Sequence, residues 1–317
     1  MQHFDAAQTR AGLPFGPLIE ALRRGFAEGC EVPLRHTHTL AGTDGQPLGT
    51  VLLMPAWRPG GRLGIKTVNV FPGNAALGKP GLHAVYTLFD ARTGEPLAQL
   101  DGDQITARRT VAASALAASY LARADATRLL VVGAGRVARL VPEALRAVRP
   151  ALREVRVWNH RPAGAQALAQ QWRDDDGIDA VAVTDLEAAV RQADIVSCAT
   201  LSTQALVQGA WLRPGTHVDL VGGFTPSMRE ADGDCLRRAR VWVDTAEAMA
   251  KAGDLLQAVA EGAFDAARLQ GTLADLCRGI SAGRMAADEI TLFKSVGTAL
   301  EDLAAAELVF DAAAGRR

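Results

Sequence analysis

The clearest chemical signal in the sequence is a glycine-rich turn, Gly133-x-Gly135-x-x-Ala138, between an apolar run and a helical pattern. The first glycine permits a tight turn, the second lets the backbone approach a pyrophosphate, and the small alanine lets helix and strand pack closely. The following helix points its first amides and the positive end of its dipole at the phosphates. The spacing therefore predicts a dinucleotide-binding site, with a ligand-free turn as the alternative.

The end of the next strand predicts which dinucleotide binds. An acidic residue there would bind the ribose 2′-hydroxyl of NAD. Here the strand is followed by Asn159, His160 and Arg161, and Asp175 and Asp176 lie too far along the chain to replace the acid. Arg161 is suited to a 2′-phosphate, so we expect NADPH in preference to NADH. The alternative is that Arg161 is a solvated loop cation.

Three basic side chains could hold a substrate carboxylate. Lys66 shares a strand face with Val68, where a lysine is unusual unless it has a partner or lines a pocket, and the alternative is an edge-strand lysine whose amine reaches water. Arg109 falls in the first turn of an alanine-rich helix, and spacing alone does not separate it from Arg108. Arg35, judged by spacing alone, is a surface strand residue.

The histidines offer two further possibilities. His83 precedes a strand, where a local hydrogen-bonding role is the simpler interpretation and a general acid is the alternative. His36 and His38 share one strand face, as metal ligands would, but no third ligand cluster accompanies them. We therefore predict no metal site.

Two sequence patterns must position these residues. The first, over residues 31–101, consists of short apolar or alternating runs between Gly/Pro turns, which predicts strands at 51–54, 64–70, 84–89 and 96–101. In the second, from residue 128, strands and helices alternate, which favours a doubly wound parallel sheet. Its predicted strands lie at 129–132, 154–158, 180–183, 195–199, 217–221 and 241–244, and its first helices at 137–148 and 163–172. Further helices are predicted at 18–28, 106–124 and 289–313.

The predicted fold class is α/β, with a Rossmann-type doubly wound parallel sheet and a smaller β-rich α+β domain. We expect the smaller domain, for substrate binding and dimerisation, to comprise residues 1–120 and 296–317. The dinucleotide-binding domain would comprise residues 121–295.

The bulk composition excludes several classes of protein. The 317 residues are 49% hydrophobic and 22% charged, with a formal net charge of -1, which gives no electrostatic case for nucleic acid or an anionic membrane. The apolar runs are too short to span a bilayer, and the first residues do not resemble a signal peptide. The four scattered cysteines favour reduced thiols, so we expect a cytoplasmic protein.

Taken together, several motifs resemble the ornithine cyclodeaminase/μ-crystallin family. They appear in family order over most of the chain, at residues 64–66, 106–110, 133–138, 199–202, 221–226 and 293–297. The resemblance implies a homodimer in which the C-terminal helix completes the N-terminal substrate-binding domain. It implies that Arg35, Lys66 and Arg109 hold the substrate carboxylate. The cofactor-binding residues would be Thr110, Gly133, Ala134, Gly135, Arg136, Val137, Asn159, His160, Arg161, Thr200, Val221 and Ser295.

One departure from the family pattern concerns Phe224. Members that cyclise ornithine carry an aspartate after the Gly-Gly pair, where it handles protons in the loss of ammonia, and this chain has Phe224 there. The Phe-Thr-Pro-x-x-Arg-Glu form, which includes Arg229 and Glu230, looks more like the branch that reduces cyclic imino acids.

The resemblance thus predicts an NAD(P)H-dependent reductase of Δ1-pyrroline-2-carboxylate or Δ1-piperideine-2-carboxylate, with L-proline or L-pipecolate as product. Lys66 and Arg109 would be catalytic, with His83 as a candidate acid and Phe224 as an apolar wall. The alternatives are an ornithine cyclodeaminase that recycles NAD, a non-catalytic crystallin-like ligand-binding protein, and a dehydrogenase of an open-chain amino acid such as alanine.

Overall fold

The computed structural model describes residues 1–315, which form two compact units. Unit 1 comprises Met1–Arg109 together with the chain from Thr298 onward, and unit 2 comprises Thr110–Gly297. The sequence predicted boundaries at 120/121 and 295/296. The first observed boundary lies earlier, inside α3 (Gly102–Leu121). The amino-terminal part of this helix belongs to unit 1, and the rest belongs to unit 2.

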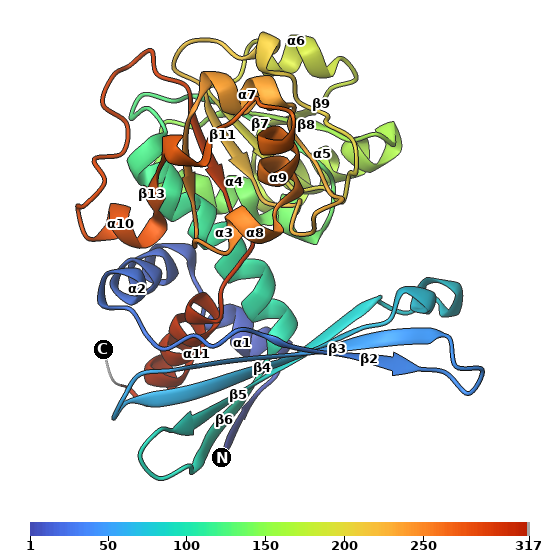
Figure 1. The fold of residues 1–317 in the computed structure, drawn as a ribbon, viewed down its shortest axis with the longest axis vertical. Helices are drawn as coiled ribbons and strands as arrows, with labels where there is room; N and C mark the ends of the chain where they lie inside the picture. The colour runs from blue at the N-terminus through green and yellow to red at the C-terminus, as the bar shows by residue number, and fades with distance from the viewer. Residues whose placement is uncertain (316–317) are drawn as a thin grey trace. The chain divides into compact units, whose positions relative to one another are not determined.

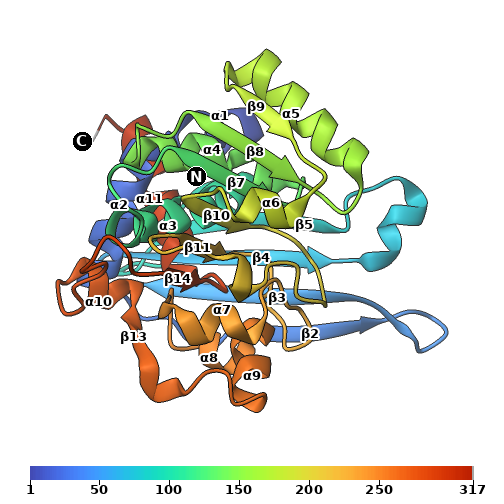
Figure 2. The same cartoon turned by 90° about the horizontal axis from the view of Figure 1, so that it is seen from above.

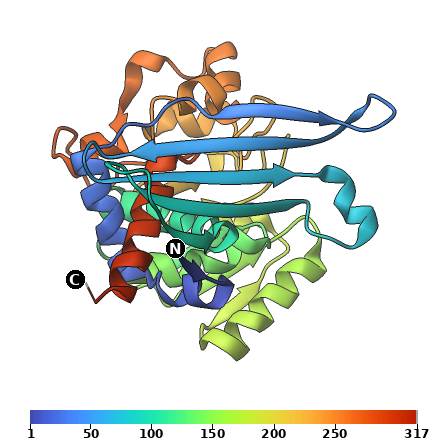
Figure 3. The same cartoon turned by 90° about the horizontal axis from the view of Figure 1, so that it is seen from below.

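Unit 1 is built on a six-stranded sheet in the order β1-β6-β5-β4-β3-β2, antiparallel except for the β1–β6 pair. Its strands are β1 (Gln2–Phe4), β2 (His36–Ala41), β3 (Pro47–Trp57), β4 (Arg62–Val70), β5 (Leu82–Asp90) and β6 (Pro96–Asp101), with a 3-10 turn η1 at Pro72–Leu77. Helices α1 (Ala6–Ala11), α2 (Phe15–Glu28) and α11 (Ala299–Ala313) cover one face of the sheet (Figure 1, Figure 3).

Strand alternation in unit 1 separates two rows of side chains. Even-numbered residues of β4 and β5 point to the face under α11, so Lys66 pairs across the strands with Met54 and Tyr86 on that face. Odd-numbered residues such as Ile65 and Val85 point to the opposite face. The predicted strands of this unit are confirmed, and most are longer than the sequence indicated.

Unit 2 is an eight-stranded, all-parallel sheet in the order β13-β12-β14-β11-β10-β7-β8-β9 (Figure 2). The strands are β7 (Arg128–Val132), β8 (Glu154–Trp158), β9 (Ala180–Ala182), β10 (Ile195–Cys198), β11 (His217–Leu220), β12 (Arg240–Val243), β13 (Leu269–Thr272) and β14 (Thr291–Lys294). The main helices and 3-10 turns are α4 (Arg136–Val148), α5 (Pro162–Asp176), α6 (Leu186–Val190), η2 (Gly209–Trp211), α7 (Gly233–Arg238), α8 (Ala248–Lys251), α9 (Gly253–Ala260), η3 (Ala266–Arg268) and α10 (Leu273–Cys277). The predicted doubly wound parallel sheet is confirmed.

The core of unit 2 lies on both faces of this sheet. One face, with buried Leu130, Val196 and Leu292, packs against α6, α7 and α9. The opposite face carries Asp219, whose carboxylate accepts a hydrogen bond from the Ser197 hydroxyl of β10 at 2.6 Å. Helices on both faces leave the strand ends as the accessible edges of the sheet.

The prediction of one helix over residues 289–313 is wrong in its first part. Residues Thr291–Lys294 form β14, which is fully buried and pairs with both β11 and β12. Gly297 has a φ of 78°, a left-handed conformation that ends the extended segment before α11 begins. The alanine-rich sequence of α11 makes the predicted helix begin before residue 299. The pairing of β14 with β11 and β12 cannot be read from local sequence.

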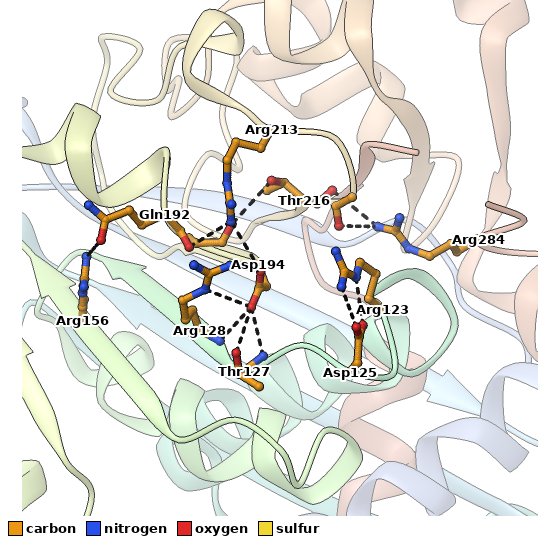
Figure 4. A network of polar contacts seen from close by, with 12 residues as sticks. Arg123, Asp125, Thr127, Arg128, Arg156, Gln192, Asp194, Arg213, Thr216 and Arg284 are labelled. Carbon is orange, nitrogen blue, oxygen red and sulfur yellow. Dashed lines mark hydrogen bonds and ion pairs between the residues drawn. The ribbon is translucent and has the colours of Figure 1, made fainter. Parts of the chain in front are cut away.

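The amino ends of the central strands are tied together by Asp194 (Figure 4). Its carboxylate accepts hydrogen bonds from the amides of Thr127 (3.0 Å) and Arg128 (3.1 Å) and pairs with the Arg128 guanidinium at 2.9 Å. Arg213 approaches the same carboxylate at 3.5 Å. This network fixes β7 against β10 at the edge opposite to the glycine-rich turn.

Candidate active site

The glycine-rich turn lies at the carboxyl end of β7, as predicted. Gly133 has a φ of 115°, and a Cβ atom there would stand 2.6 Å from the Ala199 carbonyl oxygen. Its amide donates to the Trp158 carbonyl at 2.8 Å. Backbone therefore packs directly on backbone from the ends of β8 and β10, which only glycine permits.

Gly135 behaves differently from Gly133, because a Cβ atom there would meet nothing within 4 Å. It is the N-cap of α4, and it has no side chain that could accept hydrogen bonds from the first amides of the helix. Ala138, one turn further, is fully buried. Open space in front of helix amides is what a pyrophosphate needs, so the turn fits a dinucleotide.

The other predicted cofactor residues of unit 2 lie at the same sheet edge. Thr200 follows β10, Val221 follows β11 and Ser295 follows β14, at the carboxyl ends of neighbouring parallel strands. Strand order reverses between β7 and β10, the position where open α/β sheets bind ligands. Thr110 lies on α3 at the first position of the unit.

The loop after β8 carries the residues that the sequence linked to cofactor choice. The Asn159 side-chain amide donates to the Arg161 carbonyl at 3.1 Å, which fixes the loop. His160 and Arg161 are exposed, and Arg161 is the N-cap of α5. The segment 159–161 contributes amide, imidazole and guanidinium groups and no carboxylate.

Unit 1 brings Lys66 and Arg109 together through one carboxylate. Asp302, on α11, lies with one oxygen 2.7 Å from Lys66 Nζ and the other 3.0 Å from Arg109 Nε. Arg109 also pairs with Glu301 at 2.6 Å. All four side chains are buried, with Lys66 and Arg109 2% and 6% exposed. We call Lys66, Arg109, Glu301 and Asp302 the charged cluster.

The structure separates Arg109 from Arg108, which spacing alone could not do. Arg108 Nε donates to the Leu13 carbonyl at 2.7 Å, and its guanidinium lies 4.1 Å from the centre of the Phe15 ring. Arg108 therefore anchors α3 to the start of α2, whereas Arg109 belongs to the charged cluster.

Burial and charge act against each other inside the charged cluster. Burial lowers the pKa of Lys66 to about 8, although Asp302 opposes the shift. Burial acts to raise the pKa of Asp302, but Lys66 and Arg109 outweigh it and hold that pKa below its ordinary value. Asp302 is thus ionised at neutral pH, and Lys66 is a stronger acid than a solvent-exposed lysine.

The sequence reading missed Glu301 and Asp302. Both lie in the first turn of α11 and are completely buried. Two adjacent acids in an alanine- and leucine-rich helix are unusual, and acids near a helix N-terminus also interact favourably with its dipole. That pattern was a usable signal, although it did not say which cations the acids would meet.

Three other predicted residues lie apart from the charged cluster. Arg35 is partly exposed in the segment before β2, and within the described residues no hydrogen bond or ion pair joins it to the charged cluster. His83 is exposed and pairs with Asn69, so it points to the face of the sheet opposite Lys66. Phe224 follows the Gly222–Gly223 turn of unit 2 and is 47% exposed.

Residues 1–315 contain neither a metal-binding cluster nor a membrane-spanning helix. His36 and His38 are exposed on β2, and in residues 1–315 no three His, Cys, Asp or Glu side chains are grouped to hold a metal ion. Over the same range, every helix is too short or too polar to cross a bilayer.

Comparison with known proteins gives the family. Residues 13–317 match the profile of the ornithine cyclodeaminase/mu-crystallin family. The Delta(1)-pyrroline-2-carboxylate reductase of Paracoccus denitrificans is 44% identical over 323 residues, which cover 99% of this chain and 98% of the relative.

Solved structures agree over the whole fold. The Delta(1)-pyrroline-2-carboxylate reductase of Thermococcus litoralis, in complex with NADH and L-proline, is 33% identical with a TM-score of 0.91, covering 99% of this chain and 98% of that one. An archaeal alanine dehydrogenase dimer with bound NAD is 29% identical with a TM-score of 0.89, covering 99% and 96%. The resemblance found in the motifs is confirmed, and this chain belongs to the ornithine cyclodeaminase/mu-crystallin family.

Proposed function

We propose that this protein reduces cyclic imino acids, converting Δ1-pyrroline-2-carboxylate or Δ1-piperideine-2-carboxylate to L-proline or L-pipecolate. At a coarser level, the chain is an oxidoreductase of amino or imino acids that uses a nicotinamide cofactor. The finer proposal depends most on Phe224, which stands where the ornithine-cyclising members carry an aspartate. An apolar ring at this position leaves no carboxylate there to handle protons in the loss of ammonia.

The glycine turn and its neighbours would hold the dinucleotide. Gly133 and Gly135 would let the pyrophosphate reach the first amides of α4, and Thr200, Val221 and Ser295 would line the nicotinamide half. When bound, NAD(P)H supplies the hydride for the C=N carbon. The protein's own part would be to bind and orient the cofactor and the substrate.

NADPH is the cofactor we propose as preferred. Support comes from the loop after β8, where Asn159, His160 and exposed Arg161 stand in place of an acid. A guanidinium can bind a 2′-phosphate through paired hydrogen bonds, whereas no carboxylate is present here to bind a ribose 2′-hydroxyl. Titration of the protein with NADPH and NADH should give the lower Kd for NADPH, and the reverse order would refute this preference.

Lys66 and Arg109 would bind the ring carboxylate of the substrate. Asp302 holds both cations in one geometry, so their side chains are already oriented before substrate binds. We assign the proton that the ring nitrogen needs to Lys66, because its pKa of about 8 leaves it mostly protonated yet acidic enough to donate near neutral pH. We do not assign the proton to His83, because its position in β5 directs it to the opposite face of the sheet from Lys66.

The protein would act as a homodimer, with the outer face of the unit 1 sheet as the contact. This face carries Leu53, Pro55, Ile65, Val85 and Phe89, which are apolar and only partly buried. Threonines such as Thr67 and Thr87 lie between them, and a sheet face that exposes several large apolar side chains often packs against a partner. We infer that a second copy of the chain packs on this face. Light scattering of the purified protein should therefore give the mass of a dimer.

The function is tested by mixing the protein with NADPH or NADH and each cyclic imine, and following cofactor oxidation. Ornithine with NAD, followed by ammonia release, tests the cyclodeaminase. Pyruvate with ammonia tests an open-chain amino-acid dehydrogenase. The similarity to the archaeal alanine dehydrogenase favours this second candidate. Cofactor oxidation with imines and without ammonia release supports the proposal. Ammonia from ornithine, or dinucleotide binding without any turnover, would overturn it.

A further inference from the structure

A second group of buried charges lies in unit 2, beneath the ends of β10 and β11. Glu230, Asp254 and Lys294 are all fully buried. They come from three elements: the loop after β11, the first turn of α9, and β14. The mechanism proposed above uses none of them, so their position needs an explanation.

Glu230 joins two loops with every acceptor position it has. One carboxylate oxygen accepts from the Thr200 amide at 2.7 Å and the Thr200 hydroxyl at 2.9 Å. The other accepts from the Gly222 amide at 2.7 Å and the Gly223 amide at 3.3 Å. An ionised carboxylate offers about four lone-pair sites. The side chain therefore ties the residue after β10 to the turn after β11.

Asp254 and Lys294 hold Glu230 in its place. One oxygen of Asp254 accepts from the amides of Glu230 (2.7 Å) and Ala231 (3.0 Å). Its other oxygen lies 3.1 Å from Lys294 Nζ. Because β14 pairs with β11 at Leu220, this ion pair anchors the loop to the sheet itself.

Two glycines allow the close approach. A Cβ atom at Gly222 would lie 1.8 Å from the Thr200 carbonyl oxygen, and one at Gly223 would lie 2.5 Å from an Asp254 carboxylate oxygen. Any side chain at either position would push the two loops apart. The arrangement thus consists of backbone amides packed around one carboxylate. We call the Glu230 carboxylate, together with the amides of Thr200, Gly222 and Gly223, the seat.

We propose that Glu230 is a positioning residue that sets the separation of Thr200 from the Gly222–Gly223 turn, and so aligns the two loops on which the nicotinamide half of the cofactor lies. The proposal rests on the proposed function in one respect, the assignment of this strand edge to the cofactor. Phe224, next in the chain, is positioned by the same seat.

The charge state of Glu230 makes the seat sensitive to pH. Burial raises the pKa of Glu230 to about 7, with Lys294 opposing and Asp254 reinforcing the shift. Cys198 of β10 also faces these acids, and neighbouring Arg229 is paired with Glu261. Protonation would turn one acceptor into a donor facing amide hydrogens, so the seat should loosen as pH falls below about 7.

Hydrogen exchange on the protein without cofactor tests the seat directly. In the wild type, the amides of Thr200, Gly222 and Gly223 should be protected at about pH 8 and lose roughly tenfold to hundredfold of that protection at about pH 6. Glu230→Gln should show the reduced protection at both values, because its NH2 group faces the same amide donors. The matched control is Glu261→Gln, an adjacent and half-exposed acid that should leave these amides unchanged.

Dinucleotide affinity gives a second readout. Glu230→Gln should raise the Kd for the cofactor by about tenfold and flatten its dependence on pH, without change in Glu261→Gln. Wild-type protection that is equal at both pH values, or Glu230→Gln with normal protection and affinity, would overturn the proposal. The wild-type comparison needs no variant to fold. If no imine is turned over but these measurements behave as expected, the proposed function fails and the positioning role stands.

Discussion

Replacement of Asp302 by asparagine is the sharpest test of the charged cluster. The variant keeps the size of the side chain and removes the charge that lies 2.7 Å from Lys66 and 3.0 Å from Arg109. Of the two acids in the charged cluster, only Glu301 would then keep its charge. Breaking a buried ion pair costs about 3–5 kcal/mol, a large part of the ~5–15 kcal/mol that stabilises a typical protein.

Lys66 offers a way to reduce this cost. Its pKa is already lowered to about 8 with Asp302 present, so without that carboxylate it would lose its proton near neutral pH. A neutral amine neither attracts the substrate carboxylate nor donates a proton. We therefore expect kcat/KM for the imine to fall by a hundredfold or more, an activation cost of roughly 3 kcal/mol.

The assays for Asp302→Asn are urea denaturation, steady-state kinetics and cofactor titration. The Kd for the dinucleotide should change little, because the glycine turn belongs to the other unit. Asp311→Asn is the control, since Asp311 is a part-exposed acid on the same helix whose pairing with Arg62 is worth about 0–1 kcal/mol. Wild-type stability and kcat/KM in Asp302→Asn would refute the reasoning.

Three further predictions follow from other contacts. Gly64→Ala should destabilise by at least about 1–3 kcal/mol, because the new Cβ would lie 1.8 Å from the Tyr86 hydroxyl oxygen, and Tyr86→Phe should restore part of that loss in a urea titration. Burial, with Arg284 and Arg149, lowers the pKa of His217 to about 3. The free energy of unfolding therefore includes a contribution on the order of 5 kcal/mol that is present above pH 6.5 and is lost as pH falls toward 3. The wild type should therefore lose more stability than His217→Gln between about pH 7 and pH 4, and equal losses would contradict this. Ile65→Glu should convert the proposed homodimer to a monomer in light scattering, whereas exposed Thr39→Glu should not.

Much of the fold could be predicted because its signals are local. The Gly133 turn follows a buried strand and begins α4, and that order alone predicts a Rossmann unit. Strand β14 was missed because four residues carry too little periodicity to compete with the helical pattern that follows. Its identity as a strand is set by two neighbours in the sheet, β11 and β12, which are far away in sequence.

The sequence predicts the cations of the candidate site but not the acids that pair with them. Lys66 is recognisable because a lysine on an apolar strand face is rare unless an opposite charge pairs with it. Asp302 lies more than two hundred residues further along, and pairing at that separation leaves no trace in spacing. Glu230 belongs to a recognisable sequence motif, but its contact with Thr200 depends on how β10 and β11 lie side by side.

The late position of α11 in the chain has a consequence for biosynthesis. The strand with Lys66 and the helix with Arg109 leave the ribosome long before Glu301 and Asp302 are made. Until then the nascent strand and helix carry two cations without the acids that neutralise them, and the sheet has no α11 to cover its apolar face. The first domain to be translated is thus among the last to be completed, and chaperones have a defined surface to shield in the interval.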